Sequence, residues 1–317
     1  MTWLVWRQHR SEAVLLAGLL ALLVVGLLVA GVTIAGVAAQ VGLGNCLTHH
    51  ASDGCGQRIA RFAEAFYSFN TLVMSLNVLP PLAGLFLGAP LVAREIERGT
   101  HRLAWTQSVT RGCWLTGHTI VVLGMSLVAS AGTQLVLNHV LSPVLDASDV
   151  TAFGQGRMTP IMFDAVGIVP VAYTLFAAAL GIACGVLLRR TLGAMVLVLV
   201  LFVSVRVAIG HFVRPNYVPP VTAMVVVEST HEGKAAGQPL APAGSLMLEY
   251  SYVQADGIHS DTPTCVPPRP GCFDRYTVVY QPSDRFWRFQ LTESGIYFAL
   301  SALLVSAASL LVVRRAA

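Results

Sequence analysis

The amino-acid sequence predicts an all-α polytopic membrane protein with six transmembrane helices, both termini in the cytoplasm, and a small extracellular domain between helices five and six. Of its 317 residues, 55% are hydrophobic and only 11% are charged, whereas soluble domains carry about 25% charged residues. Six stretches reach the roughly 20 apolar residues that a helix needs to cross a bilayer. Lys and Arg residues gather between alternate stretches, and this bias predicts the orientation.

The predicted spans divide the chain into membrane and non-membrane segments. The first apolar run exceeds the hydrophobic core of a signal peptide, which has about 7–15 residues, so we interpret it as an uncleaved span. The six spans are Ala13–Val41, Thr71–Ala93, Trp114–Leu141, Ala165–Leu188, Leu192–Val213 and Ser294–Val313. The predicted domains are an interfacial helix (1–12), five spans with a cytoplasmic segment at 94–111 (13–213), the extracellular domain (214–293), and the last span with its tail (294–317).

The N-terminal segment interleaves aromatic and basic residues. Trp3 and Trp6 alternate with Arg7 and Arg10, which is typical of a helix lying in the membrane interface. Anchoring of the first span by interfacial aromatic residues explains the same pattern. Both interpretations keep this segment at the inner membrane surface.

The charge distribution sets the predicted orientation. If both termini are cytoplasmic, that side carries ten Lys and Arg residues against three Asp and Glu, and the outer side carries nine against thirteen. Short cytoplasmic loops rich in Lys and Arg follow the positive-inside rule. The formal net charge of +4 therefore reports membrane topology and does not indicate binding to nucleic acid.

The six cysteines agree with this orientation. Two closely spaced pairs fall in outer loops, where an oxidising compartment favours disulfides. Cys113 and Cys184 lie at or near the inner side, and we expect them to be free. Neither pair has the spacing of a zinc site, so no metal is expected. The predicted disulfides are Cys46–Cys55 and Cys265–Cys272.

Several spans carry features that predict their packing. Pro80-Pro81 removes two backbone donors from the second span and predicts a kink there. Gly181 and Gly185 in the fourth span allow a close helix approach, either within the chain, which we favour, or at a subunit interface. The fourth and fifth spans are separated by only three residues, 189–191, and so form an antiparallel hairpin.

The segment 214–293 reads as a small folded domain. It is rich in proline, and its alternating stretches Leu246–Tyr252 and Tyr276–Tyr280 predict short strands. A segment of this kind folds as a unit and is not a linker.

No motif predicts catalysis by this chain. The residues Gly112 to Thr119 fit the spacing of a phosphate-binding loop except that His118 replaces the lysine, and they begin a membrane span instead of following a strand. No serine, histidine and acidic residue converge at one membrane depth. We therefore expect neither an enzyme nor a bound cofactor in this chain.

Three polar residues in the spans are candidates for a translocation pathway. Arg206 lies inside the fifth span, where it either snorkels or pairs structurally, or faces a translocation cavity. Gln134 and Asn138 share one helical face near the outer end of the third span. They either line a polar cleft or are solvated at the helix end.

The charged segment between the second and third spans is the strongest functional signal. Gly99-Thr100 predicts the end of one helix and the capped start of a second, at Arg102–Trp105. An ordinary solvated loop explains the basic residues, but the positive-inside rule does not require Glu95 and Glu97. We therefore interpret the segment as a docking surface.

The residues of this segment also carry a family resemblance. The run Pro90–Thr100 (PLVAREIERGT), followed by Thr106–Arg111 (TQSVTR), resembles permease subunits of ABC-2-type exporters, especially an actinobacterial branch. The run Tyr280–Gln290 (YQPSDRFWRFQ) is similar to the end of the outer domain in that branch. Six spans and the lack of an ATPase domain agree with the resemblance.

The resemblance implies a type V exporter fold in a bacterial cytoplasmic membrane. Such permeases form homo- or heterodimers and bind two copies of an ABC ATP-binding subunit, which holds the ATP and Mg²⁺. The implied cargo is a hydrophobic or amphipathic drug, antibiotic, lipid or peptide. A membrane-embedded accessory, sensor or immunity protein acting through its extracellular domain is the alternative. By position, the contact with the ATPase would include Arg94, Glu95, Glu97, Arg98, Gly99 and Thr100.

Overall fold

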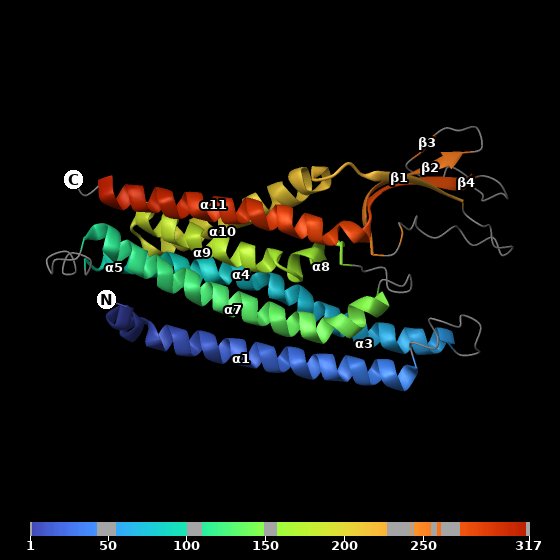
Figure 1. Cartoon of the computed structure of the whole chain (residues 1–317), viewed down its shortest axis with the longest axis horizontal. Helices are drawn as coiled ribbons and strands as arrows, with labels where there is room; N and C mark the ends of the chain where they lie inside the picture. The colour runs from blue at the N-terminus through green and yellow to red at the C-terminus, as the bar shows by residue number, and fades with distance from the viewer. Residues whose placement is uncertain are drawn as a thin grey trace.

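The computed structural model shows a bundle of long helices with a small β-sheet at one end (Figure 1). It describes residues 2–42, 55–99, 110–148, 157–226, 242, 244–254, 259–260 and 273–314. Within these residues, six helices are long and apolar enough to cross a membrane, as predicted. They are Ala21–Gln40, Ala60–Glu95, Gly112–Val140, Val169–Leu188, Thr191–Asn216 and Ser283–Arg314.

The first span is part of one long helix, α1 (Thr2–Val41). It continues without a break through the residues predicted as an interfacial helix. The next helix, α3 (Cys55–Ser75), packs beside it. Leu27 and Ile34 of α1 form a buried core with Phe62, Phe66 and Phe69 of α3.

The second span is helical throughout, but its hydrogen-bonding pattern changes between α, 3₁₀ and π. After α3 come a 3₁₀ turn (Leu76–Val78), α4 (Leu79–Ala83), a π-helical turn (Gly84–Gly88) and α5 (Ala89–Glu97). The irregular turns flank Pro80-Pro81, because proline cannot donate the helical hydrogen bond. The predicted irregularity is confirmed. The predicted start at Thr71 is too late, because the helix begins at Cys55 and its first turns are amphipathic, with charged residues opposite the buried aromatic ones.

The fourth span, α9 (Val169–Leu188), is the centre of the bundle. In its apolar 18-residue stretch 78% of the residues are buried, against at most 33% in the corresponding stretch of any other span. It contacts α7 (Arg111–Ser148), α10 (Thr191–Ala208), α4, α5 and the last helix. A Cβ added at Gly181 would lie 2.5 Å from the Gly84 carbonyl oxygen, and one at Gly185 would lie 2.9 Å from the Ala89 carbonyl oxygen. The Gly181–Gly185 face therefore packs within the chain, against the second span.

The connections around α9 are short. Arg189 takes a left-handed conformation (φ 56°) and Arg190 an extended one, and α10 starts at the next residue. This confirms the predicted antiparallel hairpin. Before α9 lies a six-residue helix, α8 (Pro160–Ala165). After α10, a π-helical turn (Ile209–Val213) and a 3₁₀ turn (Arg214–Asn216) lead to the sheet.

The sheet lies at the end of the bundle opposite both termini (Figure 1). It contains β1 (Val221–Val226), β2 (Leu246–Gln254), β3 (His259–Ser260) and β4 (Phe273–Gln281), antiparallel in the order β1-β4-β2-β3. Tyr252, Tyr276 and Val278 form its small buried cluster. Both predicted strands are thereby confirmed.

The last helix, α11 (Phe286–Arg314), follows the sheet after one 3₁₀ turn (Ser283–Arg285). The sequence predicts its start at Ser294, but the helix enters the bundle earlier. Glu293, assigned by its charge to the outer domain, is fully buried among the helices. Its carboxylate is paired with Arg214, and a paired carboxylate can be buried; the start of the membrane span at Ser294 stays a prediction.

Candidate functional site

A cleft of about 540 Å³ opens between the second span and α7. Its lining comes from α4, α5 and the turn between them, from α7, and from residues of α8, α9 and α10. Most of the lining is apolar, including Leu79, Pro80 and Phe86, and polar groups enter chiefly from α7. A cleft of this volume and polarity has the character of a small-molecule site.

The structure separates the three residues predicted for a translocation pathway. Gln134 lines the cleft, is buried, and donates a 3.0 Å hydrogen bond to the Ala165 carbonyl oxygen. Asn138 is exposed on α7. Arg206 pairs inside the bundle. Gln134 therefore lines a cleft whose lining is mostly apolar, and the role of all three residues in a translocation pathway stays a prediction.

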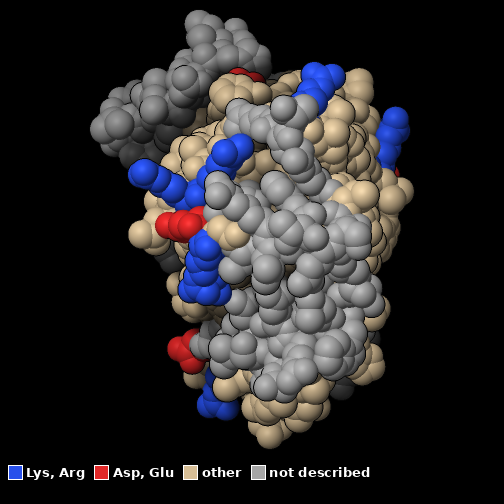
Figure 2. Space-filling model, turned by 90° about the vertical axis from the view of Figure 1, so that its left-hand side faces the viewer, with Lys and Arg blue, Asp and Glu red and all other residues tan. Residues whose placement is uncertain are grey.

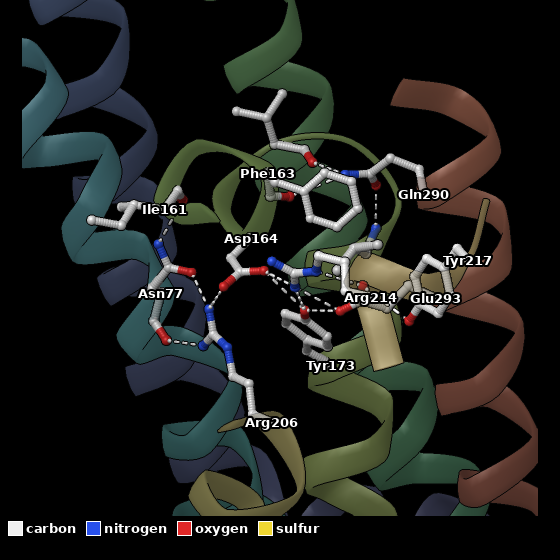
Figure 3. Close-up of polar contacts among 12 residues, drawn as sticks. Asn77, Ile161, Phe163, Asp164, Tyr173, Arg206, Arg214, Tyr217, Gln290 and Glu293 are labelled. Carbon is white, nitrogen blue, oxygen red and sulfur yellow. Dashed lines mark hydrogen bonds and ion pairs between the residues drawn. The ribbon is translucent and has the colours of Figure 1, made fainter. Parts of the chain in front are cut away.

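Two acids and two arginines meet beside this cleft, at the end of the bundle nearest the sheet. We call Asp164, Arg206, Arg214, Glu293 and Tyr173 the ionic cluster (Figure 3). Arg214 donates to both carboxylate oxygens of Glu293 at 2.8 Å and to Asp164 Oδ1 at 2.5 Å. The Tyr173 hydroxyl bridges Asp164 Oδ1 (3.0 Å) and Glu293 Oε1 (2.5 Å). The cluster thus joins α8, α9 and α11 to the segment that leads into the sheet.

Arg206 extends the ionic cluster towards the second span. Its guanidinium lies 3.0 Å from Asp164 Oδ2 and donates to Asn77 Oδ1 at 2.6 Å. It also lies 4.8 Å from the centre of the Tyr173 ring, within the range of a cation–π contact. Of the alternatives for Arg206, structural pairing is confirmed.

Gln290 forms a second polar clamp near the ionic cluster (Figure 3). Its side-chain oxygen accepts 2.9 Å bonds from the backbone amides of Ile168 and Val169, at the start of α9. Its side-chain nitrogen donates 3.0 Å bonds to the carbonyl oxygens of Phe163 and Val166. One buried side chain thus satisfies four backbone groups where α8 gives way to α9, and it fixes α11 against that junction.

Sequence reasoning missed the ionic cluster. Asp164, Arg214 and Glu293 each adjoin a predicted span boundary, and the charge of each favours a place in the outer segments. A usable signal was the spacing of Gln290 and Glu293, which places two polar groups one helical turn apart directly before an apolar run. Their partners are far apart in the sequence, so the sequence pattern does not identify them.

At the opposite end of the bundle, Glu95 of α5 contacts α7. The indole nitrogen of Trp114 donates to Glu95 Oε2 at 3.0 Å, and His118 Nε2 lies 3.3 Å from Glu95 Oε1. His118 is buried in α7. The residue that breaks the phosphate-loop pattern therefore pairs with a carboxylate between two spans.

Glu97, the last residue of α5, reaches the start of α10. Its carboxylate accepts 2.7 Å and 3.1 Å bonds from the hydroxyl and the backbone amide of Thr191. These bonds lower the pKa of Glu97 below its usual value. A carboxylate from one helix thus caps the N-terminus of another, where the helix dipole favours negative charge.

The predicted helix stop is confirmed. Arg98 still donates its amide to the Arg94 carbonyl oxygen at 3.0 Å, and Gly99 then adopts a left-handed conformation (φ 73°). Both arginine side chains are exposed. Thr100 and the predicted second helix, Arg102–Trp105, lie outside the described residues.

The predicted disulfides also fall largely outside the described part of the chain. Cys46, Cys265 and Cys272 lie outside it, and Cys55 begins α3 with an undescribed side chain. Both disulfides stay predictions. Cys113 and Cys184 are free, as expected.

Comparison with known proteins connects this architecture to one family. A family model described as "ABC-2 membrane transporter related" matches residues 17–214, which is more than half of the chain. The chain belongs to this family. No curated protein and no solved structure matches it.

Family membership and six apolar helices establish a multi-pass membrane protein of the ABC-2 permease type. The matched region covers the first five spans, the cleft, the Glu95 and Glu97 contacts and every member of the ionic cluster except Glu293. The sheet and α11 lie beyond it, so the family match says nothing of their role.

Proposed function

We propose that this ABC-2-related chain is the permease subunit of an ATP-driven exporter. The family match carries the proposal. In this proposal two copies of a separate ABC ATP-binding subunit hold the ATP and Mg²⁺, and a second permease subunit, identical or different, completes the membrane part. The chain itself has no catalytic role and exports a hydrophobic or amphipathic compound across a bacterial cytoplasmic membrane.

The end of the bundle that bears the termini and the end of α5 would face the cytoplasm. Figure 2 looks onto this end and shows more Lys and Arg than Asp and Glu side chains. The arginines near the helix ends here are Arg94, Arg98, Arg189, Arg190 and Arg314. The positive-inside rule favours the cytoplasm for such a surface, and the sheet at the far end would then be extracellular.

The contacts of α5 support a coupling role for the segment 94–111. Glu95 connects the end of the second span to Trp114 and His118 of α7, and Glu97 connects it to Thr191 of α10. A force applied to the segment would therefore act on three spans together. Both carboxylates already bond to other helices of the chain, so the exposed Arg98 is the better residue with which to probe docking.

Charge reversal at Arg98 tests the proposal. The full chain is co-expressed with a tagged ABC ATP-binding subunit from the same organism, and the amount of chain that co-purifies is measured. Loss of one charge-assisted contact at the interface should reduce recovery of R98E about tenfold. The matched control, R314E, changes the same charge at the end of α11, which lies at the same end of the bundle.

The result expected is normal recovery of the control together with loss of R98E. Equal recovery of the two variants would show that α5 does not end at a docking surface. If the unaltered chain does not co-purify with the ATP-binding subunit, the permease proposal itself fails.

A further inference from the structure

Two buried polar atoms on the wall of the cleft have no hydrogen-bond partner among the described residues. They are Gln134 Oε1 and Ser126 Oγ. Both residues line the cleft, with exposed fractions of 7% and 0%. The amide nitrogen of Gln134 is held by the Ala165 carbonyl oxygen, so the side-chain oxygen remains a fixed acceptor. A buried polar atom without a partner is costly, and a ligand that supplies the missing hydrogen bond recovers that cost.

The other polar side chains of α7 on this wall are already bonded. The hydroxyl of Ser130 donates to the Ser126 carbonyl oxygen at 2.7 Å, and the hydroxyl of Thr133 donates to the Ala129 carbonyl oxygen at 2.9 Å. The side-chain oxygens of α7 on this wall that make no hydrogen bond to a described residue are therefore Ser126 Oγ and Gln134 Oε1. They lie about 12 Å apart along the helix, at 1.5 Å per residue.

The charges around the cleft disfavour a charged ligand. Asp164 is the carboxylate on its wall, and both oxygens are occupied, Oδ1 by Arg214 and Oδ2 by Arg206. Arg94 lies at the other end of the lining, on the last turns of α5. A charged ligand group near Gln134 would lose its hydration. Because no unpaired opposite charge among the described residues lies beside it, its binding free energy would be unfavourable.

The shape of the cleft suits an elongated molecule. On the second span the lining runs from Leu76 to Arg94, which is roughly 27 Å of helix at 1.5 Å per residue. Phe86 belongs to the lining and is 59% exposed, so the cleft opens on the outer face of the bundle, which is lipid-facing in a membrane. A molecule with an apolar body can therefore enter sideways from the bilayer.

We propose that the cleft binds an uncharged amphiphile with a long apolar body and a hydrogen-bond-donating head group, such as a hydroxyl or amide. The head group donates to Gln134 Oε1, a second polar group pairs with the Ser126 hydroxyl, and the body lies along Leu79, Pro80 and Phe86. The binding site stands on the geometry alone. Its role as the site of the exported compound rests on the proposed function.

Photolabelling of the purified full chain in detergent, without any ATP-binding subunit, tests the site. Three probes share one acyl chain with a diazirine and differ only in the head group: a neutral monoacylglycerol, a fatty-acid carboxylate and a quaternary ammonium. The labelled peptides are mapped by mass spectrometry. The monoacylglycerol should label residues 76–90 and 126–134 at least about fivefold more than either charged probe, because one hydrogen bond and one desolvated charge separate them.

Two variants of α7 and one control sharpen the test. A129W fills the cleft, since Ala129 is part of its lining, and should reduce labelling about tenfold. V128W places the same indole on the neighbouring residue, which is 74% exposed and outside the lining, and should leave labelling unchanged. Q134M replaces the acceptor oxygen by an apolar side chain of similar size and should reduce labelling by the monoacylglycerol several-fold.

Equal labelling by the three probes, labelling outside the cleft, or full labelling of A129W would each overturn the proposal. A cleft covered by a second copy of the chain would instead give no labelling and an A129C cross-link between two copies, which also overturns it. These results are independent of co-purification with the ATPase. If the unaltered chain does not co-purify with an ATP-binding subunit, the proposed function fails and the binding site remains in place.

Discussion

At the residue scale, the ionic cluster is the most demanding feature of the molecule. Glu293 is fully buried and Arg214 is 5% exposed. The free energy needed to bury either charge without a partner would exceed the whole free energy of unfolding of a typical protein. Bidentate pairing between the two, with Asp164 and Tyr173 bridging them, makes burial acceptable. Removing one member should therefore lower the free energy of unfolding by more than any single contact contributes.

Replacement of Arg214 by methionine should expose this dependence. R214M leaves two carboxylates facing each other in the bundle, so the free energy of unfolding should fall by about 3–5 kcal/mol. Reversible unfolding of the chain in mixed detergent micelles measures the change. The control R288M alters an exposed arginine of the same region and should stay within about 0.5 kcal/mol of the unaltered chain. Equal effects of the two substitutions would contradict a structural role for the cluster.

At the element scale, α9 organises the bundle because small residues let the second span approach it. Gly181 lies against the backbone of Gly84, Gly88 and Ala89, where the second span passes from a π-helical turn into α5. The proline-induced change of helical geometry and the glycine face therefore act at one crossing. The same path ends at Glu95 and Glu97, so the position of α5 depends on how closely α9 packs against it.

A single methyl group should disturb this crossing. In G181A the new Cβ would lie 2.5 Å from the Gly84 carbonyl oxygen and 2.7 Å from the Ala89 nitrogen, both backbone atoms, so α9 must move away. We expect a loss of about 1–3 kcal/mol in the free energy of unfolding. The control G295A meets nothing within 4 Å on α11 and should stabilise the helix by up to about 1 kcal/mol. A neutral G181A would show that the helices are not in close contact.

At the scale of the whole molecule, the two ends of the bundle differ in composition and role. One end carries the termini, the end of α5 and a group of basic residues, and the other carries the sheet (Figures 1 and 2). The cleft runs from Arg94 near the first end to Asp164 of the ionic cluster near the second. The proposed docking segment and the sheet thus lie at opposite ends of one continuous helical framework.

The orientation of this framework is open to a direct test. A cysteine at Asp284, which is exposed beside the sheet, should react on intact cells with a membrane-impermeant maleimide. A cysteine at Arg314, at the other end of α11, should react only after the cells are permeabilised. Labelling is scored as the increase over the parent chain, which keeps its native cysteines. The reverse pattern would place the sheet in the cytoplasm and contradict the docking of an ATPase at α5.

The predictable part of the fold consists of features that depend on local sequence. Apolar runs identified the six spans, alternation identified two strands, and Gly99 marked the end of α5. At the end of the bundle nearest the sheet, the helices of the second and sixth spans extend beyond the predicted spans. In both places charged or polar side chains lie on a helix that continues, at Cys55–Ser75 and from Phe286, because one face is buried or its polar groups are paired.

The candidate site was predictable only where the residues are neighbours in the chain. Glu95 and Glu97 were identified from the sequence because the positive-inside rule does not account for two acids in a short basic segment. Their partners Trp114, His118 and Thr191 belong to other helices, so the sequence did not identify them. The ionic cluster brings together residues separated by up to 129 positions, and the cleft has walls from several spans.

The chain alone therefore established a membrane bundle with an attached sheet and a charged segment, because hydropathy and helix signals act over about twenty residues. Which charges are buried, which polar atoms beside the cleft have no partner among the described residues and which helices contact α5 were decided by folding. The physical reason is that the cost of burying a polar group depends on its partner, and the partner is supplied by the packing of distant helices.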